Sequence, residues 1–153
     1  MIRIMFVCHG NICRSPMAEF IFKDMVKKQG CADKFQISSS ATSREEEGNG
    51  MHTGTRRKLE QMGIPYSFHP ATQFTVQDYK QYDYILVMES RNVGGLLRII
   101  GRDNAGKIQR LLDFAGGGDI ADPWYTGNFD DTYRDIVAGC NGFLEHLRIQ
   151  EII

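Results

Sequence analysis

Apolar positions along the chain follow two patterns: short continuous runs, and longer stretches with a spacing of three or four. The runs are rich in β-branched and aromatic residues and predict buried strands at residues 2–7, 35–39, 82–88 and, less distinctly, 107–114. The longer stretches predict amphipathic helices at residues 16–29, 54–62, 91–100 and 130–150. In the last helix, the inward face carries Tyr133, Ile136, Val137, Phe143 and Leu147.

Strands and helices alternate in this pattern, and the strands are apolar throughout rather than at every second residue. These features predict an α/β fold: a doubly wound four-stranded parallel sheet with helices on both faces, a flavodoxin-like three-layer sandwich. Ligands of such folds bind at the carboxyl ends of the strands. The first strand ends beside Cys8, and the helix after it is expected to use Ser15 as its N-cap and Pro16 as its first residue.

The overall composition indicates one soluble domain over residues 1–153, expected to be a monomer. The hydrophobic fraction of 42% and the charged fraction of 24% are ordinary for a globular protein. A net charge of -1 argues against nucleic acid as a partner. No apolar run approaches the roughly 20 residues of a membrane helix, and the N-terminal residues show no secretion signal. We therefore expect a cytoplasmic protein that does not bind membranes.

The four cysteines are too few for a disulfide scaffold and match no common zinc-binding spacing. Without an export signal, they are interpreted as reduced thiols. Cys31 and Cys140 are expected to be buried structural side chains, whereas Cys8 and Cys13 lie in a segment with a different character.

This segment is VCHGNICRSP, at the turn from the first strand into the first helix. Such a turn directs backbone N–H groups inward beside a helix N-terminus and thereby creates an anion site. Gly10 and Asn11 are residue types that tolerate the unusual φ values of a tight cradle. The cradle and the Arg14 guanidinium would surround a phosphoryl group, with the Cys8 sulfur below the phosphorus. The helix end and Arg14 favour a thiolate, so Cys8 is the candidate nucleophile.

A second segment, ADPWYTG at residues 121–127, lies in a predicted loop before the last helix. Cleaving a phosphate ester of tyrosine expels a phenolate, whose conjugate acid has a pKa of about 10. A protonated carboxyl near the leaving oxygen removes this cost and is typically worth about 10²- to 10⁴-fold in rate. Asp122 is the candidate acid, and Pro123 stiffens the backbone beside it. Trp124 and Tyr125 would flank a flat aromatic ring.

The chain resembles the low-molecular-weight protein tyrosine phosphatases in two motifs, Cys8-His9-Gly10-Asn11-Ile12-Cys13-Arg14-Ser15-Pro16 and Asp122-Pro123-Trp124-Tyr125. The resemblance covers nearly the whole chain, including SSSATS at residues 38–43 and YDYILVMESRN at residues 82–92. It implies hydrolysis of phosphotyrosine in proteins, and of small aryl phosphates, with no metal or organic cofactor. Phosphotyrosine-containing proteins would then be the partners.

The resemblance also implies roles for individual residues. Cys8 would form a phosphocysteine intermediate, Arg14 would bind phosphate, and Asp122 would protonate the leaving group and later activate water. The implied supporting residues are Ser15 for the thiolate, and Asn11, Ser39 and His69 for the strained loop. The expected phosphate and substrate contacts are His9, Gly10, Asn11, Ile12, Cys13, Arg14, Ser15, Glu45, Trp124 and Tyr125.

Two positions depart from the family pattern. Glu45, followed by Glu46 and Glu47, stands where members often place an aromatic residue that lines the pocket. We therefore expect weak binding of small aryl phosphates and a preference for phosphopeptides with Lys or Arg beside the tyrosine. The alternative is that this loop swings away and leaves Trp124 and Tyr125 alone to frame the ring. Glu89 replaces an aspartate of the related animal enzymes, with no expected effect on the chemistry.

Three other functions remain as alternatives. A protein arginine phosphatase of the same family has threonine where this chain has Ile12, whose aliphatic side chain is better suited to an aromatic substrate. A thiol-dependent arsenate reductase needs further cysteines, and residues 76–95, where such relatives carry them, contain none. A non-catalytic phosphate-binding module would be expected to lose Cys8, Arg14 or Asp122.

Cys13 is also a candidate redox partner, because it follows Cys8 on the same tight loop and a thiolate is the form that peroxide attacks. A Cys8–Cys13 disulfide would make inactivation reversible. The basic run Arg56-Arg57-Lys58 is interpreted as a solvated helix face. His52 and His146 have no predicted role.

Overall fold

The computed structural model describes residues 1–153 and is built around a parallel sheet with the strand order β2-β1-β3-β4. Its strands are β1 (Ile2–Cys8), β2 (Phe35–Ala41), β3 (Tyr84–Val87) and β4 (Ile108–Arg110). β1 and β2 pair along their whole length, so that Cys8 lies opposite Ala41 at their carboxyl ends. The predicted parallel α/β sheet is confirmed, and the edge at which β1 and β2 end is where the Cys8 loop begins.

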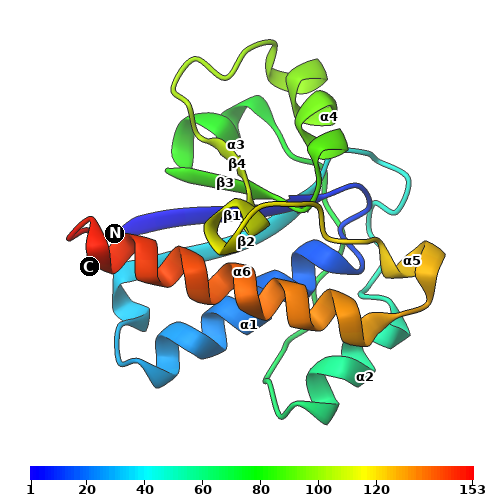
Figure 1. Ribbon diagram of the computed structural model, residues 1–153. Helices are drawn as coiled ribbons and strands as arrows, with labels where there is room; N and C mark the ends of the chain where they lie inside the picture. The colour runs from blue at the N-terminus through cyan, green and yellow to red at the C-terminus, as the bar shows by residue number, and fades with distance from the viewer.

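Helices cover both faces of the sheet (Figure 1). One side carries α1 (Arg14–Lys28), α2 (Thr53–Gln61) and α6 (Phe129–Ile149), and the other carries α3 (Val76–Gln81) and α4 (Ser90–Ile100). The side chains of β1 alternate between these faces. Ile4 and Phe6 join the core under α1 and α6, whereas Met5 and Val7 join a second core under α4. This two-sided burial explains why β1 is apolar at consecutive positions.

The larger core contains a group of aromatic rings between the sheet, α1 and α6. Phe22 packs edge-on against Phe35 at 5.5 Å between ring centres and lies 5.7 Å from Phe143. α6 also approaches the backbone of the turn after β4 closely, because residue 142 is glycine. A Cβ at Gly142 would lie only 2.0 Å from the carbonyl oxygen of Phe114.

The predicted elements differ from the structure in two places. The predicted strand at residues 107–114 is a strand only over Ile108–Arg110, and the chain then forms the 3-10 turn η2 (Leu111–Ala115). This turn buries Leu111 and Leu112 against α6, which is why the apolar pattern continues beyond the strand. The short helix α3 was not predicted, although the reciprocal cap between Thr75 and Asp78 marks its start.

The helix ends near the site also differ from expectation. α1 begins at Arg14, two residues before the predicted start, and its N-cap residue is Cys13, which makes no side-chain cap. Ser15 is therefore not the N-cap, and Pro16 is the third residue of the first turn, where its missing N–H is tolerated. The predicted loop around Asp122 contains the short helix α5 (Pro123–Thr126).

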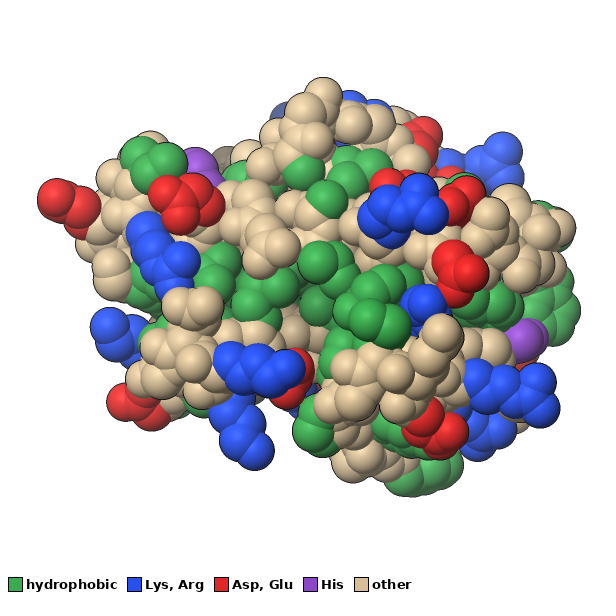
Figure 2. All heavy atoms as spheres, turned by 60° about the horizontal axis from the view of Figure 1, so that its bottom comes forward, with side chains coloured by type: hydrophobic (Ala, Val, Ile, Leu, Met, Phe, Trp, Pro, Cys, Tyr) green, Lys and Arg blue, Asp and Glu red, His purple; other side chains and the backbone are tan.

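The surface formed by α1, α2 and α6 carries basic and acidic side chains that are interspersed rather than gathered by sign (Figure 2). Arg56 and Arg57 are exposed as predicted, but Lys58 is buried, and its Nζ lies 2.7 Å from Asp130 Oδ1. Cys140 is fully buried, whereas Cys31 is only partly buried, contrary to expectation. None of the helices combines the length and the apolar character of a membrane span.

Candidate active site

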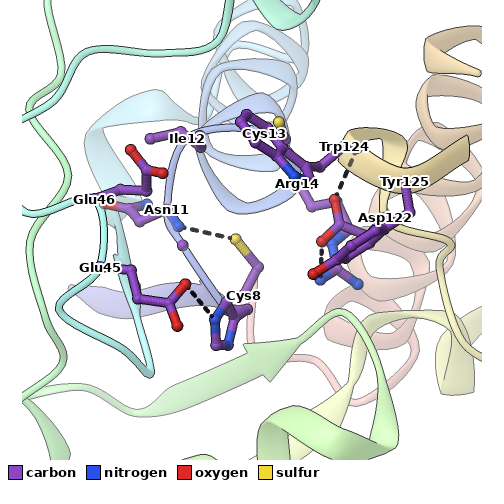
Figure 3. Close-up of a pocket in the computed structure, with 12 residues that line it drawn as sticks. Cys8, Asn11, Ile12, Cys13, Arg14, Glu45, Glu46, Asp122, Trp124 and Tyr125 are labelled. Carbon is purple, nitrogen blue, oxygen red and sulfur yellow. Dashed lines mark hydrogen bonds and ion pairs between the residues drawn. The ribbon is translucent and has the colours of Figure 1, made fainter. Parts of the chain in front are cut away.

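A cleft of about 120 Å³ opens at the carboxyl end of β1 (Figure 3). Three segments line it: the loop between β1 and α1, the segment after β2, and the start of α5. The lining residues are Cys8, His9, Gly10, Asn11, Ile12, Cys13, Arg14, Glu45, Glu46, Asp122, Trp124 and Tyr125. The structure therefore brings together the two motifs that lie more than a hundred positions apart in the sequence. Ser15 is fully buried behind the cleft rather than at its surface.

The loop owes its shape to Asn11, which adopts a left-handed φ of 58°. Its side chain is fully buried, and its Nδ2 donates to Ser15 Oγ at 2.7 Å and to Ser39 Oγ at 3.0 Å. Its Oδ1 accepts hydrogen bonds from His69 Nε2 at 2.7 Å and from Thr72 N at 3.2 Å. These bonds hold a backbone conformation that is otherwise unfavourable for a residue with a side chain. Gly10, by contrast, does not take a positive φ.

The Cys8 side chain lies at the floor of the cleft and is only 3% exposed. The backbone N–H of Asn11 donates to its Sγ at 3.2 Å, and Ser15 Oγ lies 3.1 Å from the same atom. Ser15 belongs to the N-terminal turn of α1, so the sulfur lies beside that helix end. Donors and a positive helix end around one sulfur are the arrangement that stabilises a thiolate.

Cys13 differs from Cys8 in its surroundings although both belong to one loop. Its burial, together with the negative charges of Cys8 and Asp122, raises the pKa of the Cys13 thiol to about 12. Cys13 is therefore a protonated thiol at neutral pH.

Arg14 connects the loop between β1 and α1 to the acidic side chains across the cleft. Its side chain is 1% exposed, and its Nη1 donates to the carbonyl oxygen of Ile120 at 2.9 Å. Nη2 lies 3.3 Å from Asp122 Oδ2, and Nη1 lies 3.3 Å from Glu89 Oε2. These partners fix the guanidinium plane while its remaining donors stay available to a ligand.

Asp122 is held at the start of α5, where it is the N-cap residue. Its Oδ1 accepts the backbone N–H of Trp124 at 3.0 Å, and Pro123 occupies the first helical position. Beyond it, Trp124 is 56% exposed and Tyr125 is 83% exposed. Figure 3 shows Asp122, Trp124 and Tyr125 together with Arg14 on one side of Cys8.

Two glutamates form the opposite side of the cleft (Figure 3). Glu45 Oε2 lies 3.0 Å from His9 Nε2, so the segment after β2 is attached to the loop between β1 and α1. Glu46 lines the cleft beside it, whereas Glu47 pairs with Arg44 and does not. The alternative in which this loop swings away from the cleft is therefore not what the structure contains.

Comparison with known proteins agrees with this geometry. The family model described as "Low molecular weight phosphotyrosine protein phosphatase" matches residues 3–151. The chain belongs to this family. It is 40% identical over 151 residues to the low molecular weight protein-tyrosine-phosphatase YfkJ of Bacillus subtilis, with 97% of each chain covered. The chain is thus a member of a phosphatase family, and phosphatases are hydrolases.

Solved structures of the family share the whole fold. The crystal structure of YfkJ superposes with a TM-score of 0.93 at 39% identity and covers 98% of this chain and 96% of that one. The low molecular weight protein tyrosine phosphatase SP-PTP of Streptococcus pyogenes gives a TM-score of 0.86 at 40% identity, with 96% of this chain and 93% of SP-PTP covered. DARP, a Drosophila arginine phosphatase, gives a TM-score of 0.84 at 29% identity, with 94% of this chain and 96% of DARP covered.

Several residues around this phosphatase cleft were not predicted from the sequence. Glu19 Oε1 accepts from Ser39 Oγ at 2.6 Å and lies 3.7 Å from His69 Nδ1, so it extends the network that holds Asn11. Its position between the buried residues Ala18 and Phe20 of α1 indicates a charged side chain with a partner, but the sequence does not show that the partners are Ser39 and His69. Glu89 was noted as a departure from the family, but its contact with Arg14 depends on the tertiary fold.

Proposed function

We propose that this phosphatase hydrolyses phosphotyrosine in proteins, and small aryl phosphates, through a phosphocysteine intermediate on Cys8. The observation that carries the proposal is the Cys8 sulfur at the floor of the cleft, which accepts the backbone N–H of Asn11, while Arg14 and Asp122 pair with each other in the same cleft. A phosphate dianion in this cleft would take the remaining donors of Arg14 and face the sulfur in line with the leaving oxygen.

In the first step, the Cys8 thiolate attacks phosphorus and the bond from phosphorus to the phenolic oxygen breaks. The leaving oxygen takes the proton of Asp122, so that tyrosine departs as a neutral phenol. In the second step, Asp122 accepts a proton from water, whose oxygen attacks the phosphocysteine. The sulfur leaves as a thiolate, inorganic phosphate forms, and the enzyme returns to its starting state.

The side chains at the mouth support an aromatic substrate. Trp124 and Tyr125 stand at one edge of the cleft, and Ile12 adds an aliphatic surface to its lining. A phosphotyrosine ring can pack against all three. The acidic pair Glu45 and Glu46 on the other edge favours phosphopeptides with Lys or Arg beside the tyrosine.

The direct test is to replace the nucleophile. Cys8→Ser should abolish turnover of p-nitrophenyl phosphate while inorganic phosphate still binds, because the backbone cradle and Arg14 are unchanged. Rapid acid quench of the wild type with a phosphotyrosine peptide should trap a phosphate on Cys8, identified by peptide mass. Steady-state hydrolysis retained by Cys8→Ser would exclude Cys8 as the nucleophile.

A second candidate function, protein arginine phosphatase, is favoured by the likeness to the Drosophila arginine phosphatase. It shares the phosphocysteine chemistry but needs a pocket for a guanidinium group rather than an aromatic ring. Turnover of matched phosphotyrosine and phosphoarginine peptides separates the two functions. We expect Ile12→Thr to lower the ratio of tyrosine to arginine activity, and a wild-type preference for phosphoarginine would overturn the tyrosine assignment.

A further inference from the structure

The start of α2 contacts the phosphate loop through its backbone and one side chain. The N–H of His52 donates to the carbonyl oxygen of Ile12 at 2.8 Å, and Thr55 Oγ1 donates to the carbonyl oxygen of Cys13 at 3.3 Å. Thr55 is fully buried. These two bonds attach the first turn of α2 to the loop that surrounds the phosphate site, and neither of them uses the His52 ring.

The His52 ring instead contacts two aromatic side chains on the far side of the cleft. It stacks on Phe129 with 5.3 Å between ring centres and 25° between planes, and meets Trp124 edge-on at 5.6 Å and 82°. Residue 54 must be glycine for this packing, because a Cβ there would lie 2.3 Å from Phe129 Cζ. α2, α5 and the start of α6 therefore meet at one imidazole.

A hydrogen bond fixes the orientation of this ring. His52 is the N-cap residue of α2, and its Nδ1 accepts the N–H of Gly54 at 2.9 Å. Since Nδ1 is the acceptor, the ring proton is assigned to Nε2. The cap thus holds the imidazole plane in the position from which it contacts Phe129 and Trp124.

Trp124 connects His52 to Asp122, the proposed general acid. Its backbone N–H donates to Asp122 Oδ1, and its side chain lines the cleft. The chain before Asp122 is anchored by the bond from Thr132 Oγ1 to the carbonyl oxygen of Ala121 at 3.0 Å. The backbone hydrogen bonds of α5 are internal to residues 122–128, and the one ion pair that reaches outside them joins Asp122 Oδ2 to Arg14 Nη2 at 3.3 Å. The Arg14–Asp122 ion pair, the packing of Pro123 and the contact between His52 and Trp124 therefore hold α5 against the rest of the molecule.

We propose that His52 is a positioning residue, which links the phosphate loop to α5 and sets the place of Asp122 above Cys8. The inference rests on the proposed function, in which Asp122 is the general acid. A displacement of about 1 Å in a reacting group can cost on the order of 10²-fold in rate. A side chain that holds α5 can therefore affect catalysis without touching the substrate.

Two substitutions distinguish the effect of the His52 ring from the effect of its N-cap hydrogen bond to Gly54. His52→Asn keeps an acceptor for the Gly54 N–H but removes the ring, whereas His52→Phe keeps a ring and removes the acceptor. We expect His52→Asn to lower kcat/KM for phenyl phosphate by about 10-fold and for p-nitrophenyl phosphate by less than about 3-fold, since the better leaving group depends less on the acid. His52→Phe should retain the wild-type dependence on the leaving group.

The matched control is His146→Asn. The ring of this partly buried histidine packs on Phe114 at 5.1 Å between centres, on the last turns of α6 and outside the cleft. It should change neither substrate's kcat/KM. Phe129→Leu removes the stacking partner of His52 while leaving the α2 cap intact. Phe129→Leu should lower kcat/KM for phenyl phosphate more than for p-nitrophenyl phosphate, as His52→Asn does. It provides the test if His52→Asn does not fold.

Fluorescence gives a second readout, because Trp124 is the single tryptophan of the chain. Acrylamide should quench the indole more strongly in His52→Asn than in the wild type or in His146→Asn. Equal losses on both phosphates, or wild-type kinetics together with wild-type quenching, would overturn the proposal. The same selective loss in His52→Phe would overturn the assignment to the ring. A wild type without aryl phosphatase activity would instead refute the proposed function.

Discussion

Asp122 caps α5 in the structure and is the general acid of the proposed mechanism, and replacement by asparagine separates these two roles. Its Oδ1 caps α5 through the Trp124 N–H at 3.0 Å, and its Oδ2 faces Arg14 Nη2 at 3.3 Å. Asparagine is as good an N-cap as aspartate, so Asp122→Asn should keep α5 in place. It cannot transfer a proton to the leaving oxygen. Asp122→Ala removes both the cap and the proton.

The expected magnitude follows from the two tasks. Loss of a general acid costs about 10²- to 10⁴-fold, which is roughly 3–5 kcal/mol of transition-state stabilisation. The full loss applies to phenyl phosphate, and we expect about 10-fold or less for p-nitrophenyl phosphate, whose phenolate is a far better leaving group. The lost cap in Asp122→Ala should further lower the free energy of unfolding by about 1 kcal/mol relative to Asp122→Asn.

The assay is kcat/KM across a series of substituted phenyl phosphates, because this parameter reports the step in which the phenol leaves. The logarithm of kcat/KM should fall more steeply with the pKa of the leaving phenol in Asp122→Asn than in the wild type. Parallel lines for the two enzymes would mean that Asp122 does not protonate the leaving group. Equal urea midpoints for the Asn and Ala variants would refute the argument about the cap.

Two further predictions concern the rim of the cleft and the packing of α6. Glu45→Trp should lower KM for p-nitrophenyl phosphate by about 2- to 10-fold through ring stacking, with kcat within a few-fold, whereas Glu47→Trp, outside the cleft, should not. An unchanged KM in Glu45→Trp would show that this position does not reach the substrate. Gly142→Ala should destabilise the protein by about 1–3 kcal/mol in urea unfolding, because its Cβ would overlap the Phe114 carbonyl, whereas Gly94→Ala, with open space around it, should not. Equal stability of the two alanine variants would contradict the close approach of α6.

The fold was largely predictable because a buried strand and an amphipathic helix each leave a pattern in their own residues. β1 is apolar at consecutive positions because both of its faces are covered, and that pattern predicted a buried strand. α3 was missed because it is short and buries none of its residues, so it has no apolar periodicity. The strand predicted at residues 107–114 was too long because burial, not strand pairing, explains the apolar character of Leu111 and Leu112.

The candidate site was predictable as far as its chemistry lies in contiguous sequence. Residues 8–15, from the end of β1 to the first turn of α1, are contiguous in the sequence, and the structure places them at the expected sheet edge. The partners that hold this loop come from other elements. Nothing local to Glu19 or Thr55 shows that each lies beside the loop, because that depends on how α1 and α2 pack. The same applies to His52, whose ring contacts residues far along the chain.

The proposed redox role of Cys13 follows from its difference from Cys8. Cys13 is 4% exposed, and burial with the nearby negative charges raises the pKa of its thiol to about 12, so it is not the sulfur that peroxide attacks. In the proposed sequence, the Cys8 thiolate attacks peroxide, the O–O bond breaks, and a sulfenic acid and hydroxide form. The Cys13 sulfur then attacks the Cys8 sulfur, water leaves, and a disulfide remains.

This sequence makes the protection by Cys13 measurable. Peroxide should lower the intact mass of the wild type by two hydrogens, and dithiothreitol should restore both mass and activity. Cys13→Ser should instead gain two oxygens on Cys8 as a sulfinic acid, which dithiothreitol does not reduce. Cys140→Ser is the matched control, because this thiol is also fully buried, with a pKa raised by burial, but lies in α6 outside the cleft. It should behave as the wild type does. Recovery of Cys13→Ser to the same extent as Cys140→Ser would show that the loop protects Cys8 without a second cysteine.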